Sequence, residues 1–84
     1  MENLTNNDKL VLLQHAINKY GDENTLIQKL STFLPQKEID RGIATLIATQ
    51  QVRRIGPDML QNNTSHIGEL PDIPPNLKSI IDNL

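Results

Sequence analysis

The chain has 84 residues, 37% of them hydrophobic and 21% charged, with a formal net charge of −2 and no cysteine. This length allows one small domain and excludes a doubly wound sheet or a barrel enzyme. The lack of cysteine excludes disulfides and cysteine-ligated zinc or iron–sulfur sites. With no signal-peptide pattern and no apolar run near the roughly 20 residues that span a bilayer, we expect a soluble intracellular protein that enters no membrane.

The first predicted helix covers residues 6–20. It begins after Thr5, which has the spacing of a shortened capping box with Asp8. Apolar residues then recur at helical spacing as far as Tyr20. The helix is expected to end there because the next residue, Gly21, suits the left-handed backbone that closes many helices.

Two further helices are expected before residue 52. The second is capped by Asp22 or Asn24, and it ends before Pro35, because proline disfavours helical backbone in the residue that precedes it. Proline fits the first turn of a helix, so the third helix begins at residue 35 or 36 and runs to about residue 51. Gly42, inside the third helix, indicates a close approach of a neighbouring helix.

The rest of the chain is predicted to be mostly irregular. Residues 52–55 have strand character, whereas residues 58–75 lack periodicity and are expected to run as extended chain over the surface. A short amphipathic helix is expected at the end. Its apolar residues, at spacings i, i+3, i+4 and i+7, are Leu77, Ile80, Ile81 and Leu84. So short a helix must dock on the domain or on a partner to be stable.

Two runs of residues resemble the Myb/SANT repeat. The runs are Ile17–Gly21, with its Tyr-Gly ending, and Ile27–Lys37, with its Leu-Pro pair. In that family the first pair ends helix one and the second precedes helix three. The resemblance implies an all-α fold, a three-helix helix-turn-helix bundle of the homeodomain or Myb type over residues 1–56. An extended segment over residues 57–84 follows it and ends in the short helix.

A winged-helix domain is the alternative within the helix-turn-helix class. Residues 38–55 look like a recognition helix that runs into a wing strand. No second strand with matching alternation is visible over residues 58–67. Both interpretations place the same three helices in the same order.

The residues that could carry catalysis are scattered. His15 and His66 lack the short spacings of metal ligands, the serines have no nucleophile motif, and the four glycines form no phosphate-binding loop. We therefore expect no enzyme, no cofactor or metal, and no small-molecule substrate.

The third helix and the residues after it are the candidate binding surface. Residues 24–56 hold five basic and two acidic residues, whereas both ends of the chain are acidic. Basic side chains would contact phosphates, and the small side chains of the third helix would form a low-charge surface for a protein partner. The candidate residues for partner or DNA binding are Lys37, Arg41, Ala44, Thr45, Ala48, Arg53 and Arg54.

By resemblance, the expected function is that of a non-catalytic protein–protein interaction module in a nuclear transcription or chromatin assembly. The missing tryptophans and the acidic ends favour the SANT-like branch, which contacts proteins. Direct DNA binding by the helix-turn-helix unit, Myb-like or winged-helix-like, is the alternative, and a small adaptor without a nucleic-acid connection is a third. The sequence leaves the partner and the oligomeric state open.

Overall fold

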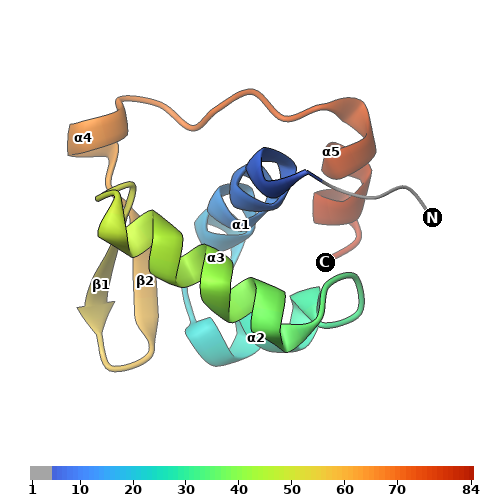
Figure 1. The fold of residues 1–84 in the computed structure, drawn as a ribbon, viewed down its shortest axis with the longest axis horizontal. Coiled ribbons are helices and arrows are strands. Elements are labelled where there is room, and N and C mark those ends of the chain that lie inside the picture. The colour runs from blue at the N-terminus through green and yellow to red at the C-terminus, as the bar shows by residue number, and fades with distance from the viewer. Residues whose placement is uncertain (1–4) are drawn as a thin grey trace.

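The computed structural model describes residues 5–84, so the first four residues of the predicted 1–56 domain lie outside the described part. Figure 1 shows the β-hairpin at one end of the molecule and the last helix at the other, with a C-terminal segment that crosses above the first helix to reach it. The elements in chain order are α1 (Asn6–Lys19), α2 (Glu23–Leu30), α3 (Gln36–Ala48), β1 (Val52–Gly56), β2 (Met59–Asn62), α4 (Thr64–Ile67) and α5 (Pro75–Asp82).

The prediction of an all-α, three-helix fold is wrong. Strands β1 and β2 form a two-stranded antiparallel sheet, and β2 lies in the segment that was expected to be irregular. Only Leu60 is buried among the four residues of β2, so the strand shows too little alternation to be recognised from the sequence. The order α1–α2–α3–β1–β2, with the hairpin as the wing, is that of the winged helix-turn-helix alternative.

The prediction of the first helix is confirmed to within one residue. The Thr5 hydroxyl accepts a hydrogen bond from the Asp8 backbone amide at 3.0 Å, and the Asp8 carboxylate accepts one from the Thr5 amide at 3.1 Å. This reciprocal capping box fixes the start of α1. The second and third helices end earlier than expected, α3 at Ala48, and Gln50 then reverses the chain with a φ of 64°.

The core lies between α1, α2, α3 and the hairpin. Its buried residues are Leu12, Leu13, Ala16, Ile17, Leu26, Leu30, Leu34, Ile39, Ile43, Leu46, Val52 and Leu60. The predicted close approach at Gly42 is confirmed, because a β-carbon there would collide with the Leu13 side chain of α1. This contact sets the distance between α1 and α3, and it leaves the opposite side of α3 facing solvent.

The C-terminal segment docks on α1 of its own chain. It crosses the molecule from α4 to α5 (Figure 1), and α5 places Leu77 in a fully buried position. Ile80, Ile81 and Leu84 are partly buried against the core. The predicted boundary between residues 56 and 57 falls in the turn of the β-hairpin. Strand β2 of the wing therefore lies in the segment 57–84, which was predicted to be an extension outside the domain.

Three side chains of α1 hold the C-terminal segment by polar contacts. His15 Nε2 lies 2.7 Å from the carbonyl oxygen of Pro71. Farther along the helix, Lys19 donates to the carbonyl of Ile81 at 3.0 Å. The hydroxyl of Tyr20, the C-cap residue of α1, donates to the carbonyl of Leu84 at 2.7 Å. Among the described residues, no helix is long and apolar enough to span a membrane.

Candidate functional site

The solvent side of α3 and the neighbouring strand β1 form one exposed surface, which we call the α3–wing face. The helix turns Ile39, Gly42, Ile43 and Leu46 inward, so the residues between them point outward. All the binding residues that the sequence predicted are exposed on these two elements or between them: Lys37, Arg41, Ala44, Thr45, Ala48, Arg53 and Arg54.

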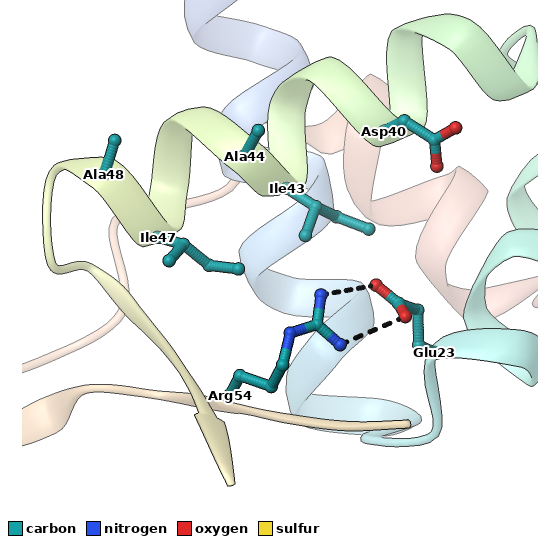
Figure 2. Close-up of a pocket in the computed structure, with 7 residues that line it drawn as sticks. All are labelled: Glu23, Asp40, Ile43, Ala44, Ile47, Ala48 and Arg54. Atoms are coloured by element: carbon teal, nitrogen blue, oxygen red, sulfur yellow. Dashed lines mark hydrogen bonds and ion pairs between the residues drawn. The ribbon is translucent and has the colours of Figure 1, made fainter. Parts of the chain in front are cut away.

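A groove of about 440 Å³ lies on this face between α3 and the side chain of Arg54. Its lining residues are Glu23, Asp40, Ile43, Ala44, Ile47, Ala48 and Arg54. Figure 2 shows Ile43 and Ile47 pointing from α3 toward Arg54 and Glu23. The groove is therefore apolar along α3 from Ile43 to Ala48, and it carries Asp40 at the preceding turn of α3 and the Glu23–Arg54 pair opposite the helix.

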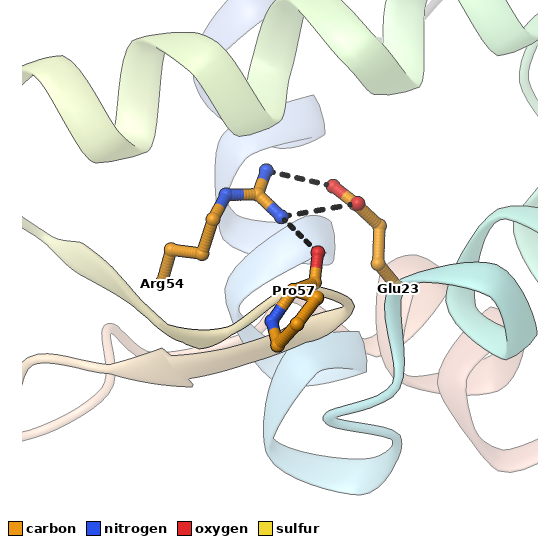
Figure 3. A network of polar contacts seen from close by, with 3 residues as sticks. All are labelled: Glu23, Arg54 and Pro57. Carbon is orange, nitrogen blue, oxygen red and sulfur yellow. Dashed lines mark hydrogen bonds and ion pairs between the residues drawn. The ribbon is translucent and has the colours of Figure 1, made fainter.

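The side chain of Arg54 is paired with the carboxylate of Glu23, so it is not free to bind a ligand. Its guanidinium donates to both carboxylate oxygens of Glu23, at 3.2 and 3.1 Å, and to the carbonyl of Pro57 at 3.3 Å (Figure 3). The hydrogen bond and negative charge of Glu23 raise the pKa of Arg54 above its ordinary value. A planar pair of this kind is geometrically specific, so Arg54 closes one side of the groove as a neutral unit with Glu23.

The position of Glu23 follows from local structure at the start of α2. Asp22 caps this helix by accepting from the amide of Thr25 at 3.2 Å, and Glu23 is the first helical residue. The Glu23 amide donates to the carbonyl of Asp58 in the turn of the hairpin at 2.7 Å. The wing is thus attached to the start of α2 by one backbone bond and one ion pair.

The other charges on the α3–wing face divide into paired and unpaired groups. Glu38 pairs with Lys9 of α1 at 3.6 Å. Within residues 5–84, Lys37, Arg41 and Arg53 have no ion-pair partner. Asp40, an exposed acid that lines the groove, has none within the same residues either.

The threonine hydroxyls of α3 are partly committed to the helix itself. Thr45 donates to the carbonyl of Arg41 at 2.9 Å, and Thr49 donates to that of Thr45 at 2.9 Å. Both hydroxyls keep acceptor capacity, but their protons are engaged. The predicted binding residue Thr45 therefore offers a partner a methyl group and an acceptor.

The sequence analysis missed part of this site. Ile43 and Ile47 have the spacing of core residues, and only the structure shows that they also line the groove. Glu23 lies far along the chain from Arg54, so no local pattern connects the two. Asp40 is part of the groove, and the alternation of acids and bases along the helix is the only sequence signal for it.

The described residues offer no assembled metal site, because no three His, Asp or Glu side chains within them lie close enough to share an ion. His15 contacts the C-terminal segment, whereas His66 is exposed on α4. The groove itself contains a carboxylate–guanidinium pair, a second carboxylate and aliphatic side chains. Such an arrangement can hold another molecule by contact and charge.

The fold combines helices with a two-stranded antiparallel sheet, and the α3–wing face lies where the two meet. No protein-family model matches the chain, and neither a curated protein nor a solved structure does. The resemblance to the Myb/SANT repeat therefore stays a prediction.

Proposed function

We propose that this chain is a non-catalytic protein–protein interaction module of a nuclear transcription or chromatin assembly, and that it binds its partner on the α3–wing face. The observation that supports this proposal is the apolar groove between α3 and β1. Because Arg54 is already paired with Glu23, the groove offers hydrophobic contact in place of a free cation. Protein–protein interfaces are likewise depleted of charged residues at their centre, and in this groove Asp40 is the one charged side chain without an ion-pair partner among the described residues.

Small side chains leave the groove open to a partner. Ala44 and Ala48 are exposed on α3 and end at their β-carbons, so an incoming side chain can reach the half-buried Ile47 between them. Apolar surface grouped in this way on a small domain is typical of a binding site.

Direct DNA binding is the second candidate, and the order of the elements favours it. In helix-turn-helix domains the helix in the place of α3 enters the major groove. Lys37 and Arg41 are exposed on α3, and Arg53 is exposed on β1. Three cations are few, however, because established binders neutralise about 6–10 phosphates. Asp40 is exposed on the same helix and repels phosphate, so we rank this function second.

A DNA titration separates the two candidates. A labelled random duplex is titrated with the full chain, and fluorescence anisotropy is followed at about 50 and 200 mM salt. The proposal predicts no binding at micromolar protein in either buffer. Micromolar binding that falls at least about tenfold at the higher salt, and is lost in a Lys37, Arg41, Arg53 triple alanine variant, would establish the DNA function instead.

Selection of protein ligands tests the first candidate directly. Peptides displayed on phage are selected on the immobilised full chain, and their Kd values are measured by calorimetry for the chain and for two variants. Ala48→Arg fills the groove, whereas Ser79→Arg adds the same side chain on α5. We expect the first to weaken binding at least about tenfold and the second to leave it within about twofold. The proposal is contradicted if the Kd values of the selected ligands do not change in the Ala48→Arg variant while circular dichroism shows that both variants are folded.

A further inference from the structure

We propose that the partner binds as an extended peptide that adds a third strand to the free edge of β1, with aliphatic side chains toward α3 and one basic side chain toward Asp40. This inference rests on the proposed function and gives it a binding mode. Addition of a strand to a sheet edge supplies affinity through backbone hydrogen bonds and specificity through alternate side chains.

The direction of the backbone groups in β1 is fixed by the bonds of β2. Arg54 lies opposite Leu60 in the sheet, and the Leu60 amide donates at 2.8 Å to the carbonyl of Gly21, away from β1. Opposite residues in an antiparallel pair either exchange both bonds or exchange none. The amide and carbonyl of Arg54 therefore face away from β2.

The end of the hairpin confirms the same alternation. The carbonyl of Gln51 accepts from the Asn63 amide at 2.9 Å, so the backbone of Gln51 faces β2 and that of Val52 faces away from it, as that of Arg54 does. Val52 is only 1% exposed, so Arg54 carries the outward backbone groups that a peptide can reach. Within residues 5–84 the sheet has two strands, and the outer edge of β1 has no strand beside it. The outer edge of β2, by contrast, is bonded to the segment between α1 and α2 through Gly21. The sheet thus has one free edge, and it belongs to β1.

The groove on the α3–wing face continues along this edge. A second hollow of about 430 Å³ is lined by Ile47, Gln50, Val52, Arg53, Arg54 and Asn63. It shares Ile47 and Arg54 with the first groove, so the two form one channel. Three successive residues of β1 line it, as expected for a channel along the edge of a strand. Every second side chain of an added strand would face the aliphatic surface of α3.

The charge of the channel selects the peptide. Glu23 and Arg54 neutralise each other, whereas Asp40 has no ion-pair partner among the described residues. The part of the channel along α3 therefore carries an unpaired negative charge, Asp40, next to aliphatic side chains (Figure 2), whereas the unpaired cation Arg53 lines the part along β1. A segment with aliphatic residues at alternate positions and one lysine or arginine matches both features.

A second copy of this chain fits the edge less well. Antiparallel pairing of β1 with β1 would bring the exposed Arg53 of each copy into the same short ladder, and like charges across a ladder are destabilising. We therefore assign the edge to a different chain.

The experiment uses capped peptides of alternating valine and threonine in which one lysine is moved through every position. The ¹⁵N-labelled full chain is titrated with each peptide by NMR, and amide hydrogen exchange is measured at Arg54. We expect the best peptide to perturb β1 and α3 and to slow exchange of the Arg54 amide at least about tenfold. Unchanged exchange at saturation would overturn strand addition.

Backbone methylation of the peptide gives the sharpest control. In an added strand, every second amide of the peptide points toward β1. N-methylation of these amides should weaken binding at least about tenfold, whereas N-methylation of the amides between them should weaken it by less than about twofold. Equal effects of N-methylation at the two alternating sets of positions would refute strand addition. Asp40→Asn should weaken only the lysine peptides, about two- to fivefold. Asp72→Asn, an exposed acid outside the channel, should change nothing.

The outcomes separate this inference from the proposed function. If selected ligands depend on Ala48 but leave the Arg54 amide unprotected, the interaction function stands and strand addition is wrong. If no protein ligand depends on the α3–wing face, the proposed function itself fails. Protection of the Arg54 amide without peptide, together with a dimer in sedimentation, would assign the edge to a second copy and overturn the inference.

Discussion

Substitution of Leu77 by alanine should release the C-terminal segment while the rest of the domain stays folded. Leu77 is the fully buried side chain of α5, and a helix of this length is not stable without packing. Replacement of a buried leucine by alanine costs about 2–5 kcal/mol. We take the loss in docking free energy as about 3 kcal/mol, and each 1.4 kcal/mol changes an equilibrium constant by a factor of ten. The population of molecules with an undocked segment should therefore rise by about 100-fold.

Trypsin reports this opening, because Lys78 is exposed on α5 directly after Leu77. Proteolysis follows the open population when opening and closing are faster than cleavage. We expect the Leu77→Ala variant to be cut after Lys78 about 100 times faster than the unmodified chain. Cleavage after Arg41, in the middle of α3, should stay at its original rate because that site requires unfolding of the domain.

Two controls keep the result interpretable. Peptides that cover α5, with and without the substitution, correct for the effect of the new residue on trypsin itself. Ser79→Ala, at an exposed position of the same helix, should alter cleavage by less than about threefold. The reasoning is refuted if cleavage after Lys78 rises less than about threefold in the Leu77→Ala variant, or if cleavage after Arg41 rises equally.

Four further substitutions should change the free energy of unfolding, measured by urea titration. Thr5→Ala removes the capping box of α1 and should lower it by about 1 kcal/mol. Gly68→Ala should lower it by about 1 kcal/mol or more, because φ is 78° there. Gln50→Gly should raise it by about 0.5–1 kcal/mol by relieving a φ of 64°. Gln14→Met should raise it by up to about 1 kcal/mol, since Gln14 Nε2 is buried without a partner within residues 5–84. A change of opposite sign at any site contradicts the reason given for it.

The helices could be predicted because their signals are local. The capping box of α1 lies within four consecutive residues, Thr5 to Asp8. Pro35 sits at the N-cap of α3, close to where the sequence placed the start of that helix. Gly42 indicated the approach of α1 because a glycine inside a helix is otherwise unfavourable. In each case the residues that determine the structure are neighbours in the sequence.

The strand character predicted for residues 52–55 is confirmed by β1, but β2 and the position of the hairpin could not be predicted, because their bonds join distant parts of the chain. The Leu60 amide is bonded to Gly21, and the Arg54 side chain to Glu23, 31 residues away. These partners are neighbours only in the packed domain. One local signal was present: Gly56 and Pro57 separate the two strands, and such a pair is typical of a turn between them.

The same limit applies to the candidate site. The helical spacing of Ile43 and Ile47 identifies an apolar face, but spacing does not show how much of that face its neighbours cover. The hairpin leaves Ile47 only half-buried, and this partial coverage creates the groove. Exposure of an apolar side chain is thus a property of the packed domain.

The three polar contacts between α1 and the C-terminal segment all end on backbone carbonyl oxygens, those of Pro71, Ile81 and Leu84. A carbonyl is present at every position, so these bonds set the path of the segment without selecting its side chains. Sequence selectivity rests on the register that the Leu77 side chain imposes. Exposed positions of α5 such as Lys78 and Ser79 are therefore open to wide substitution, and they are suitable places to attach a fluorophore or a surface anchor without disturbing the α3–wing face.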